Sequence, residues 1–238
     1  MTGTEQNALA LDIKTIAPAL APGKQPRFRN SSDFEIFAVN AALRDDSGDI
    51  STRTFFRDAS GPTSELSLIE TAMEWCTAQN PSVVYSYNGE SVGFVQLARR
   101  PELAAAEAGV SETATERVEE FLRTTRSIDL KKSVWSRFGR VLKFDEAVYE
   151  ATGRPVPATR WRAYDHGFDI EGARETAGLD PTSPELQATD IPLLGNHYLS
   201  RCDAGEGSSN EFAELQAMLR DYCTTTLSCQ FELAAEFA

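Results

Sequence analysis

The stretch LALDIKTIAP (residues 9–18) combines an apolar run with two opposite charges, Asp12 and Lys14. Side chains alternate between the two faces of a β-strand, so residues two positions apart lie on the same face. A strand at about 8–14 would therefore place an acid and a base side by side. Charged side chains are rarely buried unless they are paired or functional. This stretch therefore indicates an active site or the remnant of one.

The next elements follow from hydrophobic patterning. Two β-rich runs, FEIFAVNAAL (34–43) and ISTRTFFRD (50–58), are separated by RDDSGD, which has the composition of a hairpin turn. SELSLIETAMEWCTAQN (64–80) has apolar residues at helical spacing and ends before a proline. SVVYSY (82–87) is typical of a buried strand, and it ends at Asn88-Gly89.

The second half of the chain is predicted to be mostly helical. We expect a helix opening at VGFVQLARRPEL, more helix around 105–120, a short strand at 126–130, helical pieces at 131–138 and 144–152, a loop-rich segment at 153–190, and helices at about 185–202 and 209–236. An antiparallel meander followed by alternating helices and strands predicts an α/β fold, a mixed sheet flanked by helices in one domain spanning 1–238. In such folds the ends of the first and fourth strands lie together, where sites usually form.

The amino-acid composition limits the kinds of protein that this chain could be. The 238 residues include 36 Asp and Glu against 23 Lys and Arg, a net charge of −13, and the bases are 5 Lys and 18 Arg. An acidic surface poor in lysine favours a halophilic protein over a merely acidic mesophilic one. With no run of 18 apolar residues and no basic leader followed by an apolar stretch, we expect a cytoplasmic protein with no membrane contact.

Cysteine and histidine patterns argue against a zinc site. The chain has 4 Cys and 2 His, and their spacings match no metal knuckle. Free, mostly buried thiols are the simpler interpretation. No phosphate-binding loop, dinucleotide fingerprint or hydrolase nucleophile motif is present.

Residues 131–162 form a basic stretch in this acidic chain. It holds eight bases and three acids, so it carries +5 and the remainder carries −18. Such a stretch is a candidate contact for an anionic ligand, and Trp135, Trp161 and Tyr164 in or beside it could stack on bases. The alternative is that the arginines pair with nearby acids and the tryptophans belong to the core.

Three short stretches, in this order, carry a family resemblance: LDIKT on the first strand, YSYNGESVGFVQLARR after the fourth, and LRDYCTTTLSCQFELA in the last helix. They resemble the motifs of 3′–5′ exonucleases of the ribonuclease H-like superfamily, namely D-I-E-T, N-G-x-x-F-D and Y-x-x-x-D. The relevant branch has a tyrosine in the third motif and is related to the exonuclease domain of family B DNA polymerases. The resemblance spans the whole chain and implies a ribonuclease H-like mixed sheet flanked by helices.

The resemblance implies a site of four carboxylates that hold two divalent cations about 3.5–4 Å apart, with the tyrosine helping to place the attacking water. Two of the matching positions keep the family residue, Asp12 and Tyr222. Three positions depart from it: Lys14 replaces the glutamate, Gly93 the second-motif aspartate, and Thr226 the third-motif aspartate.

One carboxylate of four cannot hold two Mg²⁺ ions, because hard cations need several oxygen ligands. Lys14 would neutralise Asp12 and repel a cation. We therefore expect no cofactor and a loss of metal-dependent hydrolysis; if any metal binds, Asp12 alone is expected to ligate it. The alternative is an active exonuclease using Mg²⁺ or Mn²⁺ with rearranged ligands, for which Glu90 and Asp221 are the nearest acids in sequence.

The leading hypothesis is a pseudo-exonuclease retained as a binding module for single-stranded DNA or RNA or for another protein. The nucleic-acid-binding candidates are Asn88, Lys131, Lys132, Arg160, Trp161 and Arg162. A further alternative is a partner-binding subunit without nucleic-acid contact. For Asn88-Gly89 the simpler interpretation is a strand-to-helix turn in which Gly supplies the unusual backbone angles and Asn caps the helix. His197 is interpreted as structural.

Overall fold

The central feature of the computed structural model is a five-stranded sheet in the order β3-β2-β1-β4-β5. The structure describes residues 7–18, 27, 30–111, 113–159 and 168–237. β1 pairs antiparallel with β2 and parallel with β4; β2 pairs antiparallel with β3, and β4 parallel with β5. The predicted mixed sheet is confirmed. The strands are β1 (Ala8–Ile16), β2 (Glu35–Arg44), β3 (Ile50–Phe56), β4 (Val83–Ser86) and β5 (Arg126–Asp129).

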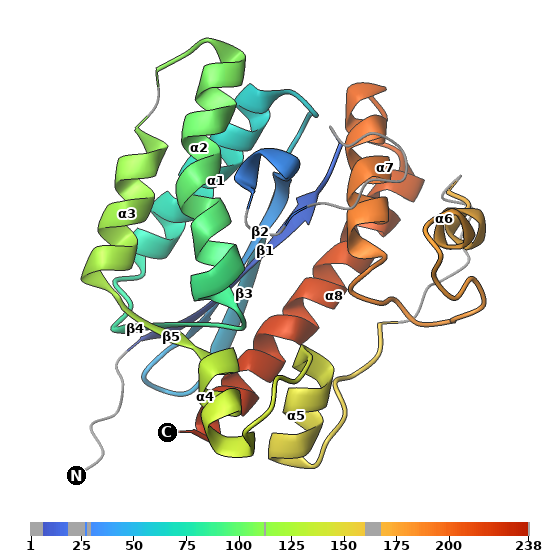
Figure 1. Cartoon of the computed structure of the whole chain (residues 1–238). Coiled ribbons are helices and arrows are strands. Elements are labelled where there is room, and N and C mark those ends of the chain that lie inside the picture. The colour runs from blue at the N-terminus through green and yellow to red at the C-terminus, as the bar shows by residue number, and fades with distance from the viewer. Residues whose placement is uncertain (1–6, 19–26, 28–29, 112, 160–167, 238) are drawn as a thin grey trace.

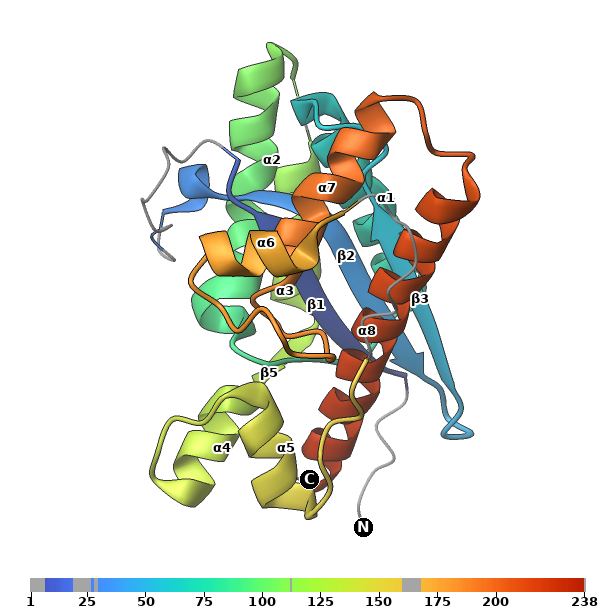
Figure 2. The same cartoon turned by 90° about the vertical axis from the view of Figure 1, so that its right-hand side faces the viewer.

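Helices cover both faces of this sheet. In Figure 1 the helices α1, α2 and α3 lie on one side, and α7 and α8 lie on the other. Figure 2 shows α8 crossing the sheet obliquely, with the α4–α5 hairpin near its C-terminal end. The helices are α1 (Pro62–Ala78), α2 (Phe94–Ala108), α3 (Ala114–Thr124), α4 (Leu130–Phe138), α5 (Phe144–Thr152), α6 (Ile170–Thr176), α7 (Ile191–Asp203) and α8 (Asn210–Ala235), with short turns η1 (Ser31–Asp33) and η2 (Gly89–Gly93).

Successive side chains of β1 point to opposite faces of the sheet, so β1 contributes to the hydrophobic core on both sides. Leu9 and Leu11 pack into the cluster under α1, α2 and α3. Ala8 and Ala10 face the other layer, where they meet the last turns of α8. Small side chains on this face allow a helix backbone to approach the sheet closely. α8 therefore passes directly over the part of β1 that carries Asp12 and Lys14.

A buried ion pair joins the helices of the first layer. Glu65 of α1 and Arg100 of α2 are at most 1% exposed, and Arg100 Nη2 lies 2.7 Å from Glu65 Oε2. Glu65 Oε1 also accepts hydrogen bonds from Arg100 Nε and from the backbone N–H of Ile36. Desolvation raises the pKa of Glu65 despite the opposing effect of Arg100. This pair therefore ties two helices to the start of β2.

One sequence expectation around the 153–190 segment is wrong. The segment is rich in loops, as expected, and also contains the short α6, but the following helix begins at Ile191 rather than at about 185. Pro192 occupies the first turn of α7, where its missing N–H leaves no helical hydrogen bond unmade. Asp190 fixes the preceding loop, because its carboxylate binds Arg174 and accepts the N–H of Gln187.

Within the described ranges, no helix is both long enough and apolar enough to cross a lipid bilayer.

The Glu65–Arg100 pair generates a stability prediction. Arg100→Met should lower the free energy of unfolding by about 3–5 kcal/mol, because it leaves a buried carboxylate without its partner. Adding Glu65→Gln should recover much of that loss, since the amide oxygen still accepts the N–H of Ile36. Urea denaturation measures both. Arg99→Met on the exposed side of α2 is the control, with an expected change of about 0.5 kcal/mol or less. Equal losses at Arg99 and Arg100 would contradict the assignment.

Candidate functional site

Asp12 and Lys14 form an ion pair in the middle of β1. The Lys14 Nζ atom lies 2.8 Å from Asp12 Oδ2, and the two side chains are 14% and 22% exposed respectively. Both point to the face covered by α8, as expected from strand alternation. The neighbouring buried amide of Asn40 on β2 donates to the backbone oxygen of Asp12. The acid and the base of the first motif therefore bind each other.

Tyr222 of α8 lies over this ion pair. The Lys14 Nζ atom is 5.0 Å from the centre of the Tyr222 ring, within the range of a cation–π contact. Burial lowers the pKa of Lys14, but Asp12, Tyr222 and Cys223 together outweigh it, so the pKa lies above the ordinary lysine value. Burial also raises the pKa of the Tyr222 phenol. A charged ammonium and a neutral phenol are therefore the stable forms at neutral pH.

Thr226 lies one helical turn beyond Tyr222. Its hydroxyl donates to the Tyr222 carbonyl at 3.0 Å, a bond within the helix itself. A carboxylate at this position would bring two anionic oxygens to the site; the threonine brings a hydroxyl already used by the backbone.

The second motif forms the turn between β4 and α2. Asn88 adopts a left-handed conformation (φ 65°), and η2 leads from it into α2. The expected roles are reversed here: Asn88, not glycine, has the positive φ, and its side chain makes no capping bond. Gly89 is needed for space, because a Cβ there would lie 2.0 Å from Ser86 Oγ. The turn is tight because β4 and η2 are packed together.

Gly93 of η2 lies near Asp12 of β1. The two residues line one small cavity together with Ser86 and Phe94. A Cβ added at Gly93 would meet only Ile13 Cγ1, at 3.9 Å. The fold therefore leaves room at Gly93 for a side chain that the sequence does not supply.

These residues do not fit a two-metal centre. Asp12 Oδ2 is bound by the Lys14 ammonium, Gly93 has no side-chain ligand atom, and the Thr226 hydroxyl donates to the backbone. In the part of the chain that the structure describes, no group of three or more His, Cys, Asp or Glu side chains is placed to hold a metal ion. Of the two substitute acids, Glu90 is bound to Lys132, and Asp221 is on the exposed side of α8.

The role of Asp129 was not recognised from the sequence. Its buried carboxylate accepts the backbone N–H groups of Asn88 at 2.8 Å, Glu90 at 3.2 Å and Lys131 at 3.0 Å. It therefore caps α4 and holds the second-motif turn against the end of β5. The available signal was an aspartate near the end of a predicted strand, two residues before the predicted helix.

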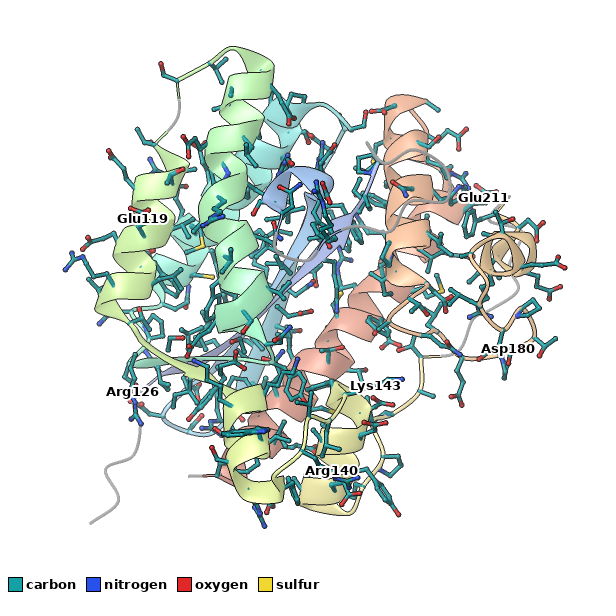
Figure 3. All side chains as sticks on the ribbon, viewed as in Figure 1. Glu119, Arg126, Arg140, Lys143, Asp180 and Glu211 are labelled. Carbon is teal, nitrogen blue, oxygen red and sulfur yellow. The ribbon has the colours of Figure 1, made fainter. Side chains whose placement is uncertain are left out.

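The basic stretch is largely neutralised in its described part. Lys131 donates to the side chain of Asn88, and Lys132 is bound to Glu90. The arginines follow the same pattern, in the pairs Arg137–Glu236, Arg140–Glu150 and Arg154–Glu232. Figure 3 shows Arg140 and Lys143 at the α4–α5 hairpin. Trp135 is 58% exposed, so it is not a core residue. Arg160, Trp161, Arg162 and Tyr164 lie outside the described residues.

His197 and the four cysteines complete the set of candidate residues. His197 stacks on Phe168 with ring centres 4.6 Å apart. The four cysteines are free thiols, three of them buried. Burial raises the pKa of the Cys76 and Cys223 thiols to about 12.

Comparisons with known proteins support the fold. No family model matches the chain, and no curated protein matches it. A solved structure of the family B DNA polymerase from the hyperthermophilic archaeon Pyrobaculum calidifontis is similar, with a TM-score of 0.52 and 11% sequence identity. The match covers 95% of this chain and 24% of the polymerase chain. The similarity is one of fold, consistent with a ribonuclease H-like arrangement.

Breaking the ion pair should destabilise the protein. Lys14→Met should lower the free energy of unfolding at pH 7 by about 2 kcal/mol, because it leaves the Asp12 carboxyl group beneath α8 without its partner. Asp12→Asn added to Lys14→Met should recover most of this. The exposed Lys143→Met serves as control, with a change of about 0.5 kcal/mol or less. A double variant no more stable than Lys14→Met would contradict the role of the pair.

The same pair predicts a pH dependence. The pKa of Lys14 is higher in the folded chain than its ordinary value of 10.5. Its stabilisation is therefore complete below pH 10.5 and is lost as the pH rises through the folded pKa. The difference in unfolding free energy between the wild type and Lys14→Met should be constant from neutral pH to about pH 9.5 and shrink at higher pH. A difference that shrinks below pH 9 would contradict this.

Proposed function

We propose that this chain is a ribonuclease H-like module of the 3′–5′ exonuclease type that no longer hydrolyses nucleic acid and functions by binding another protein. The observation that carries the loss of hydrolysis is the Lys14–Asp12 ion pair beneath Tyr222. The similarity to a family B DNA polymerase supports the fold type on which the proposal rests.

Electrostatics make the ion pair incompatible with a cation at the same carboxylate. An ammonium 2.8 Å from Asp12 Oδ2 competes with a metal for that oxygen and repels a dication nearby. Replacing Lys14 would be needed to vacate this oxygen, and two further carboxylates would be needed at 93 and 226 to complete the ligand set.

The choice of a protein partner rests on the basic stretch. Phosphate binding requires Lys and Arg side chains that are available to replace counterions. Lys132, Arg140 and Arg154 are instead bound to glutamates of the chain itself. The nucleic-acid hypothesis keeps Arg160, Trp161 and Arg162 as its candidates, so it is the alternative that a binding experiment must exclude.

An exonuclease assay tests the loss of hydrolysis. End-labelled single-stranded DNA and RNA should remain intact with Mg²⁺ or Mn²⁺, at both about 0.1 M and about 2 M KCl, so that a salt-requiring activity is not missed. Asp12→Ala should change nothing. The triple variant Lys14→Glu, Gly93→Asp and Thr226→Asp restores the four carboxylates of the family. It tests the proposed ancestry and should gain metal-dependent hydrolysis of the labelled strands. Metal-dependent trimming by the wild type that Asp12→Ala abolishes would overturn the proposal.

A binding titration tests the partner class. Labelled oligothymidylate and oligouridylate should bind no more tightly than about 10⁻⁴ M at physiological salt, the weak end of non-specific binding. Reversing Lys131, Lys132, Arg160 and Arg162 to Glu should leave this unchanged. The matched control reverses four exposed arginines elsewhere: Arg99, Arg123, Arg126 and Arg220. Tight binding that is lost only in the first variant would assign the module to nucleic acid instead.

A further inference from the structure

The strand β3 forms one outer edge of the sheet. It ends the strand order, so within the described ranges β2 is the strand that it pairs with, on one side of its backbone. Figure 2 shows β3 at the outer margin of the sheet. The strand at the opposite edge, β5, has four residues, whereas β3 has seven and pairs with β2 in continuous register. A long, regular edge strand is a template for pairing with another strand.

The sequence of β3 lacks the devices that usually prevent such pairing. Natural edge strands are protected by proline, by lysine or by bulges. The strand ISTRTFF (50–56) contains no Pro, Gly or Lys, and residues 50–53 are all exposed. Its one charged residue, Arg53, has its guanidinium 4.9 Å from the centre of the Phe55 ring on the same strand. The charge is therefore held along the strand by a neighbouring side chain.

The hairpin decides which backbone groups of β3 point outward. At one end of the β2–β3 ladder the N–H of Asp45 donates to the carbonyl of Asp49, and at the other the N–H of Arg57 donates to the carbonyl of Phe37. In an antiparallel ladder, residues that bond to the neighbouring strand alternate with residues whose N–H and C=O point the other way. The odd-numbered residues therefore bind β2. The outward groups belong to Ile50, Thr52, Thr54 and Phe56.

The side chains of these outward residues match their own reverse order, with an apolar residue at each end and two threonines between them. When a second β3 runs antiparallel about a twofold axis at position 53, Ile50 lies opposite Phe56 of the other copy, and Thr52 lies opposite Thr54. Aromatic with β-branched and Thr with Thr are both favourable cross-strand pairs. This register pairs every outward N–H and C=O of the strand. A shift of two residues leaves those of Ile50 or of Phe56 unpaired.

We infer that β3 is a self-association site, at which two copies of this chain pair antiparallel and join their five-stranded sheets into one. An unrelated extended segment could make the same backbone hydrogen bonds, but the side-chain order of β3 is complementary to a second β3. The inference goes beyond the proposed function and does not rest on it, because Asp12 and Lys14 lie on β1, which β2 separates from β3.

Arg53 opposes this pairing and makes it depend on salt. In the inferred register it faces Arg53 of the second copy, and like charges directly opposite each other are destabilising. Each guanidinium leans along its own strand toward Phe55, and because the strands are antiparallel the two lean in opposite directions. The repulsion is thereby reduced. Each chain also carries a net charge of −13, so the association should be stronger in concentrated salt.

Sedimentation equilibrium of the full chain measures the association. We expect a reversible dimer with a dissociation constant on the order of 10⁻⁵ M at about 2 M KCl, and weaker association at about 0.1 M. Thr52→Pro removes an outward N–H and should weaken the dimer about tenfold or more, because the same hydrogen bond is lost twice across the twofold axis. The matched control Thr52→Val keeps this N–H and should change the dissociation constant about twofold or less. Circular dichroism and the urea midpoint confirm that each variant is folded.

Cross-linking tests the register without relying on proline. Opposed residues of a non-hydrogen-bonded antiparallel pair have Cα atoms about 4.5 Å apart, within the range of a disulfide. Arg53→Cys should therefore give a covalent dimer when diamide takes up the two hydrogens of the introduced thiols. Ser51→Cys is the control, because it is also exposed on β3 but its two copies lie four residues out of register, about 13 Å apart. Non-reducing electrophoresis separates dimer from monomer, and the wild type with its four free cysteines gives the background.

Three outcomes would overturn the inference. A chain that stays monomeric across the concentration series at both salt concentrations would exclude self-association. A dimer that a folded Thr52→Pro variant leaves intact would use another surface. Equal cross-linking of Arg53→Cys and Ser51→Cys would mean that the thiols meet by random collision or in another register. Since none of these variants alters residues 12, 14, 93 or 226 or the basic stretch, their result is independent of the exonuclease assay and of the binding titration.

Discussion

The central strand of this fold carries an acid and a base on a face that a helix covers, and the surrounding packing depends on their neutralising each other. An unpaired carboxylate or ammonium at that depth would be costly. Lys14 and Asp12 meet at 2.8 Å, and Tyr222 closes over the ammonium. With the charges paired, α8 can lie against β1 as it does on the neighbouring alanines. The pair that permits this packing also occupies the oxygen that a metal-dependent site would use.

Two buried arginines elsewhere in the fold are also paired with acidic side chains. Arg57, almost fully buried, binds Glu35 and the carbonyls of Ser60 and Gly61, and so fixes the connection from β3 to α1. Arg174 binds Asp190 and two loop carbonyls, and so fixes the loop between α6 and α7. A guanidinium satisfies several acceptors in a fixed plane, which a lysine cannot do. At these two positions arginine therefore has a structural use that lysine could not supply.

Much of the fold could be predicted from local patterns. The alternation of β1, the hairpin of β2 and β3, and the long apolar stripe of α8 all lie within short windows of sequence, and the observed bounds agree with them closely. The start of α7 and the short α6 were missed. Their positions depend on the contact of Arg174 with Asp190, 16 residues away, which no local periodicity records.

The candidate site, like the fold, has features that follow from local sequence and features that depend on tertiary contacts. The sequence by itself determined that Asp12 and Lys14 share a face and that positions 93 and 226 lack carboxylates, because strand alternation and residue identity are local facts. Only the tertiary structure decided that Lys14 and Asp12 meet beneath Tyr222, that Asp129 supports the Asn88 turn, and that Arg140 and Arg154 on either side of α5 are paired with glutamates. The contacts of Lys14 with Tyr222 and of Asn88 with Asp129 join residues far apart in the chain, so their geometry is fixed by how the sheet and helices pack rather than by neighbouring residues.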